Sequence, residues 1–141
     1  MPNKFEELVD LCRSCGIKVD LNPFCSRGNN YRSGWIELDF RNEYLPEYLK
    51  RTGLSLIEYQ FYGLLHELGH ATHLDEHINS FTSKVEEEQD AWERAYHIHC
   101  LLWGEPPLEF HIAWIDAIQT YHQAAAELAA LPEEKRRRPK W

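Results

Sequence analysis

The sequence predicts an α+β fold: a mostly helical single domain with a small antiparallel or mixed sheet packed beside one central helix. Three observations predict this class. Two short segments alternate apolar and polar residues, as strands do, and most of the chain after residue 41 has apolar residues at helical spacing. The chain also has 141 residues with 43% hydrophobic content, which suits one core rather than two. We expect one domain over residues 1–131 and a flexible basic tail at 132–141.

The N-terminal part is predicted to form one helix followed by two strands. Residues 3–16 carry apolar side chains at helical spacing and end in Gly16, where a helix C-terminal cap is expected. The segments "IKVDL" at 17–21 and "WIELDF" at 35–40 alternate apolar and polar residues, so each is predicted to be a strand with one buried face. Residues 22–34 between them are rich in Gly, Asn and Ser and are predicted to form a long connection without a strand.

The rest of the chain is predicted to be helical. Ser55 and Glu58 have the spacing of a capping box, so a helix should begin there and run for about five turns to His73. Two more helices are predicted, at 84–103, ended by Gly104 and the Pro106–Pro107 pair, and at about 108–131.

The first of these helices contains "HELGH", residues 66–70. His66 and His70 are four residues apart, so their imidazoles project from one helix face at about 6 Å and can share one metal ion. Glu67 lies at the side of that face, where its carboxylate can act as a general base on water. This is the H-E-x-x-H arrangement, and it predicts Zn²⁺ bound by His66 and His70. Two core histidines bonded to backbone carbonyls are the alternative.

A catalytic zinc site requires a third protein ligand. At about 100° per residue, Glu88 falls in the apolar sector of the helix at 84–103, where an unpaired carboxylate would be costly. We predict Glu88 as the third ligand, with Glu87 and Glu86 next; an ion pair would be the alternative explanation. His73 shares the face of His66 but lies about 10 Å along the axis, too far for one ion unless the helix breaks.

Charge and composition limit the partners. The net charge of −8 argues against nucleic acid binding by the core domain, since phosphate backbones are bound through clustered Lys and Arg. No segment reaches the roughly 20 apolar residues of a membrane span, and the chain does not begin with a signal peptide. Four cysteines do not form a secreted disulfide pattern. We therefore expect a cytoplasmic protein that acts away from membranes.

The motifs "HELGH" and Glu88-x-x-Ala91, with "GWIELDF" ahead of them, resemble those of the ImmA/IrrE family of zincin-like metallopeptidases. The resemblance covers about residues 4–103. It implies a zincin-like (gluzincin) fold, zinc ligands at His66, His70 and Glu88, and Glu67 as general base. It also implies intracellular peptide hydrolysis, with a helix-turn-helix transcriptional repressor as the candidate substrate.

Two points of function stay open. The same zinc site could be structural, and the domain would then be a non-catalytic zinc-binding module acting in protein–protein interaction or regulation. The group that stabilises the oxyanion is also open, among Tyr96, His73, His77 and Tyr31. For the substrate, we hypothesise that "WIELDF" is an edge strand that pairs with an extended peptide.

Overall fold

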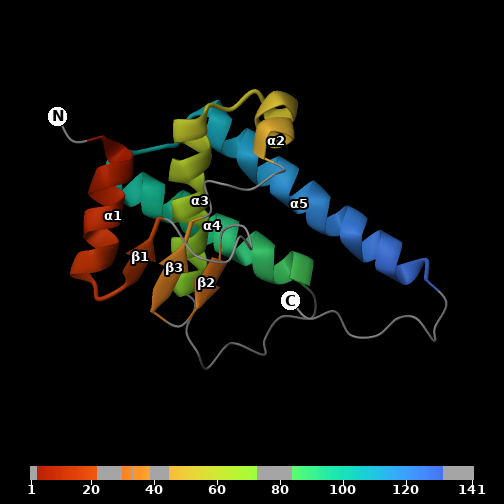
Figure 1. Ribbon diagram of the computed structural model, residues 1–141, viewed down its shortest axis with the longest axis horizontal. Helices are drawn as coiled ribbons and strands as arrows, with labels where there is room; N and C mark the ends of the chain where they lie inside the picture. The colour runs from red at the N-terminus through yellow and green to blue at the C-terminus, as the bar shows by residue number, and fades with distance from the viewer. Residues whose placement is uncertain (1–2, 22–29, 33, 39–44, 73–83, 132–141) are drawn as a thin grey trace.

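The computed structural model describes residues 3–21, 30–32, 34–38, 45–72 and 84–131, and within them the predicted α+β class is confirmed (Figure 1). Most of the described residues are helical, and the strands form one small sheet. The elements in chain order are α1 (Lys4–Ser14), β1 (Lys18–Asp20), β2 (Asn30–Arg32), β3 (Trp35–Glu37), α2 (Leu45–Thr52), α3 (Leu56–Ala71), α4 (Lys84–Trp103) and α5 (Leu108–Ala129). The predicted tail at 132–141 lies outside the described residues.

The sheet is mixed and has the strand order β1-β3-β2. β1 runs parallel to β3 and pairs Val19 with Ile36, both buried, whereas β2 runs antiparallel to β3. β2 lies inside the segment that was predicted to contain no strand, and that prediction was wrong. With three residues, β2 is too short to show an alternating pattern. The edge-strand hypothesis for "WIELDF" was also wrong, because β3 is the middle strand and is paired on both sides.

Local signals explain the helix ends. α1 is followed by Gly16 with a φ of +82°, a left-handed conformation that glycine adopts without strain, as predicted. α3 begins with the predicted capping box, in which the Glu58 amide donates to the Ser55 hydroxyl at 3.1 Å and the Ser55 amide donates to the Glu58 carboxylate at 2.9 Å. α3 ends at Ala71, and the predicted end at His73 lies outside the described residues. α4 has the predicted bounds.

α3 is the central element of the domain. It packs against α1, α4 and α5 and against strands β2 and β3, so the sheet lies beside the helix that carries "HELGH" (Figure 1). The buried core around it is apolar and includes Leu8, Ile36, Leu64, Leu65 and Phe110. None of the described helices combines the length and apolar character needed to cross a membrane.

Candidate metal centre

α3 brings the two histidines of the motif together. The rings of His66 and His70 lie on one face, with centroids 4.7 Å apart, as their four-residue spacing predicts. Both side chains are mostly buried, at 13% and 16% exposure. Glu67, one residue further around the helix, is buried. The site is therefore built on a rigid helix whose opposite end is held by a capping box.

α4 contributes Glu88 to the same point. The Nε2 atom of His66 lies 2.5 Å from Glu88 Oε2, and the Nε2 atom of His70 lies 3.2 Å from Glu88 Oε1. Glu88 is 2% exposed, as its position in the apolar sector of the helix predicted. Of the two neighbouring acids, Glu86 is exposed, and Glu87 forms an ion pair with Lys84 at 3.7 Å. Glu88 is thus the acid of this run that contacts both imidazoles.

The close approach of α3 and α4 depends on Gly69. A Cβ atom at this position would lie 2.1 Å from the carbonyl oxygen of Ala91 on α4, which is a severe clash. Gly69 therefore lets the two backbones touch, one residue from His70 and one turn from Glu88. This contact accounts for a glycine in a helix interior, where it costs about 1 kcal/mol relative to alanine.

Two sets of three side chains could hold one ion. The ligand atoms of His66, Glu67 and His70 all lie within 4.8 Å of one another, and Glu88 contacts the Nε2 atoms of both histidines. Glu67 instead approaches His66 at Nδ1, with its Oε1 atom 3.5 Å away. We favour the set with Glu88, because both Nε2 atoms point to this carboxylate. Two imidazole nitrogens and one carboxylate oxygen match the donor set of a catalytic zinc.

Burial and charge act against each other on the acidic groups. Burial raises the pKa of Glu67 and outweighs the opposite effect of His66 and His70. Burial would also raise the pKa of Glu88, but the hydrogen bonds of the two histidines prevail and hold it well below its usual range. For His70, burial lowers the pKa, but the hydrogen bond with Glu88 outweighs this and raises it. Glu88 is therefore kept ionised, as a metal ligand must be.

Three further side chains surround this group, and sequence reasoning assigned none of them to the site. Lys84 Nζ lies 3.2 Å from Glu88 Oε1. Trp92 stacks on the His66 ring at 4.7 Å with an angle of 14° between the planes. On α5, burial and the charges of Glu88 and Glu67 raise the pKa of the Tyr121 hydroxyl. Lys84 could have been found from its i, i+4 spacing to Glu88, but Tyr121 comes from a separate helix and has no sequence signal.

Of the oxyanion candidates named from the sequence, Tyr96 is the one whose side chain the structure describes. Its ring packs against the rings of Phe110, His111 and Trp114. His73, His77 and the side chain of Tyr31 lie outside the described part of the chain.

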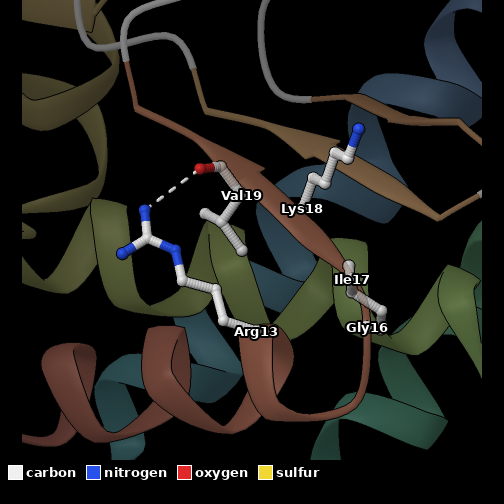
Figure 2. A pocket seen from close by; sticks show the side chains of 5 residues that line it. All are labelled: Arg13, Gly16, Ile17, Lys18 and Val19. Carbon is white, nitrogen blue, oxygen red and sulfur yellow. Dashed lines mark hydrogen bonds between the residues drawn. The ribbon is translucent and has the colours of Figure 1, made fainter.

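A separate hollow of about 380 Å³ lies where α1 meets β1, lined by Arg13, Gly16, Ile17, Lys18 and Val19 (Figure 2). The Arg13 guanidinium donates a hydrogen bond to the Val19 carbonyl at 3.3 Å. Lys18 points away from Arg13, and its Nζ lies 5.9 Å from the centre of the Trp35 ring. The lining contains no acid, histidine or thiol, so the metal-ligating side chains lie elsewhere.

Comparisons of the chain with protein-family models, with curated proteins and with solved structures found no match. We therefore infer the chemistry of this protein from the geometry of the side chains around His66, His70 and Glu88.

Proposed function

We propose that this chain is a small zinc metallopeptidase with a zincin-like fold. The observation that carries the proposal is the convergence of the His66 and His70 Nε2 atoms on the buried Glu88 carboxylate. Buried Glu67 lies beside them in the order that the H-E-x-x-H arrangement requires. The resemblance of these motifs to those of the ImmA/IrrE family supports the same reading.

In this mechanism His66, His70 and Glu88 would hold the ion. Zinc, when bound, polarises the scissile carbonyl and lowers the pKa of water. The Glu67 carboxylate accepts the proton of the attacking water and then donates it to the leaving amine nitrogen. Glu67 is 3% exposed, so its carboxylate is shielded from bulk solvent. The stacked Trp92 ring restrains the His66 imidazole.

The proposed substrate is a peptide or protein segment in the cytoplasm. The resemblance implies a helix-turn-helix repressor as the first candidate. The net charge of −8 fits a protein partner better than a nucleic acid.

The test compares the wild-type protein with Glu67→Gln. We expect the variant to keep its zinc, measured by elemental analysis, and to lose at least about 100-fold in peptide cleavage, since general acid–base catalysis contributes 10²–10⁴-fold. Glu93→Gln is the matched control, because it makes the same change at an exposed position of α4 and should cleave normally. A Glu67→Gln variant that cleaves like the wild type would contradict the role of Glu67. A wild-type protein that takes up no zinc would contradict the site.

A second candidate function is a non-catalytic zinc-binding module that acts in protein–protein interaction or regulation. The ion pair between Lys84 and Glu88 favours this function, because the carboxylate of the site then also stabilises α4. In that case Glu67→Gln should reduce stability, and neither protein should cleave peptides in the presence of zinc.

A further inference from the structure

Arg94 of α4 is hydrogen-bonded to the end of α3, and the two helices pack against each other (Figure 1). The Arg94 Nη1 atom donates to the carbonyl of Thr72, the residue that caps the C-terminus of α3, at 3.2 Å. The last carbonyls of a helix have no partner within the helix and form its negative pole, so a cation suits this position. Arg94 Nε donates to Asp90 Oδ2, one turn earlier on α4, at 2.7 Å. The guanidinium therefore joins the C-terminus of α3 to α4.

Thr72 connects this bond to the turn that carries His70. The Thr72 hydroxyl donates to the Gly69 carbonyl at 2.9 Å, and the Thr72 amide donates to the Leu68 carbonyl at 3.0 Å. His70 lies between Gly69 and Thr72 in the chain, so both hydrogen bonds close over it. A displacement of Thr72 would therefore move the His70 imidazole.

The bond of Arg94 adds to the backbone contact between Gly69 and Ala91. A contact at one point sets the distance between two helices, and a further contact away from it restrains the angle between them. This angle determines where His70 Nε2 lies relative to Glu88 Oε1, which is 3.2 Å away. Because the ligands of a metal site must be held to within about 0.5 Å, the restraint bears directly on metal binding.

The chemistry of arginine suits this bridge. Its planar guanidinium presents several N–H groups in fixed directions, so one side chain can donate to a carboxylate and a carbonyl together, which the point charge of lysine does not reproduce. Asp90 offsets the charge of Arg94 through an i, i+4 ion pair. Their side chains are 36% and 29% exposed, so solvent screens the pair and it contributes little to stability. The contact therefore acts mainly on geometry.

We propose that Arg94 is a positioning residue for the metal centre: by binding the Thr72 carbonyl, it fixes the end of α3 so that His70 faces Glu88 of α4. The inference rests on the proposed zinc site. It assigns to the proposed site a residue that does not touch the ion.

The test measures zinc affinity, by competition with a chromophoric chelator, for the wild type, Arg94→Met and Arg94→Lys. Loss of a residue that orients a metal ligand weakens binding by about 10–100-fold, and we expect about 10-fold for Arg94→Met because Arg94 acts through the helix end. The visible spectrum of the Co²⁺-substituted protein should change as well, because the His70 imidazole is reoriented. Arg94→Lys keeps the charge without the two fixed donors, so it should also bind zinc more weakly, and it provides the test if Arg94→Met does not fold.

Arg51→Met is the matched control. It makes the same change in another pair of an arginine with an aspartate, Arg51 with Asp116, which joins α2 to α5. This variant should bind zinc like the wild type.

The outcomes separate the two proposals. Failure of the wild-type protein to bind zinc would overturn the proposed function. A wild type that binds zinc, together with an Arg94→Met variant of equal affinity and unchanged Co²⁺ spectrum, would overturn the role of Arg94 alone. Wild-type affinity in Arg94→Lys would overturn it too, because a positive charge would then suffice. Equal weakening by Arg94→Met and Arg51→Met would also overturn it, since the effect would then be a general loosening of the helices.

Discussion

Gly69 on α3 has no room for a side chain, because a Cβ atom there would lie 2.1 Å from the carbonyl oxygen of Ala91 on α4. The two helices touch at this point through their backbones. Since His70 follows Gly69 and Glu88 lies one turn before Ala91, the distance between histidine and carboxylate is set by this contact.

Gly69→Ala should therefore destabilise the protein. Overpacking costs about 1–3 kcal/mol, and removing a helical glycine returns up to about 1 kcal/mol, so we expect a net loss on the order of 1–2 kcal/mol. Chemical denaturation measures it, and zinc affinity should fall in parallel. Ala125→Gly, at an exposed position of α5, measures how much the difference in helix propensity between alanine and glycine contributes to stability in this protein. A Gly69→Ala variant that is more stable than the wild type would contradict the backbone contact.

Lys84→Met separates a metal site from a purely ionic cluster. Lys84 Nζ lies 3.2 Å from Glu88, and a cation at this distance competes with a divalent ion for the carboxylate. We expect the variant to bind zinc as tightly as the wild type or a few-fold more tightly, while the protein stripped of metal loses stability. Isothermal titration and thermal unfolding with and without chelator measure both effects. Zinc binding that disappears in Lys84→Met would contradict this competition.

Trp92 should act on His66 through its stacked ring. The Trp92 Nε1 atom has no hydrogen-bond partner among the described residues, so Trp92→Phe keeps an aromatic face and sacrifices no hydrogen bond. We expect Trp92→Phe to retain most of the zinc affinity and Trp92→Leu to lose roughly 10-fold or more, by the rule for residues that orient a metal ligand. Equal affinities of the two variants would show that stacking is unimportant.

His99 makes stability depend on pH. Burial lowers its pKa, and the charge of Lys4 acts in the same direction, against the hydrogen bond of its Nδ1–H to the Gly104 carbonyl at 2.7 Å. Because the folded pKa lies below the unfolded value of about 6.5, the contribution of His99 is present above that pH and is lost as the pH falls. Urea denaturation between pH 7.5 and 5 should show a steeper loss for the wild type than for His99→Gln. Parallel curves would contradict the assignment.

Arg51 and Asp116 join α2 to α5 by two hydrogen bonds of 3.0 Å. The Arg51 side chain is half-exposed, so solvent screens the pair and its contribution should not exceed about 1 kcal/mol despite the two-pronged geometry. Asp116→Asn should lower the unfolding free energy within that limit, less at high salt, and should leave zinc affinity unchanged. A loss of zinc binding would mean that α2 supports the site.

The sequence by itself determined the helices and the helix face that carries His66 and His70. Capping residues and apolar spacing are local signals, so the bounds of α4, the capping box of α3 and the inward position of Glu88 could all be predicted. The pairing of His66 with His70 also follows from the helix period alone. β2 could not be predicted, because its residues are held by pairing with β3 and not by a pattern of their own.

Only the tertiary structure decided how the helices meet. The reason for Gly69 lies in a carbonyl group of α4, and the hydrogen bond of Trp114 with Gln89 depends on the path of α5. Such relationships join residues that are far apart in the chain, and no periodicity within one helix encodes the distance to another. The sequence therefore names the side chains suited to hold a metal ion, and packing brings His66, His70 and Glu88 within reach of one another.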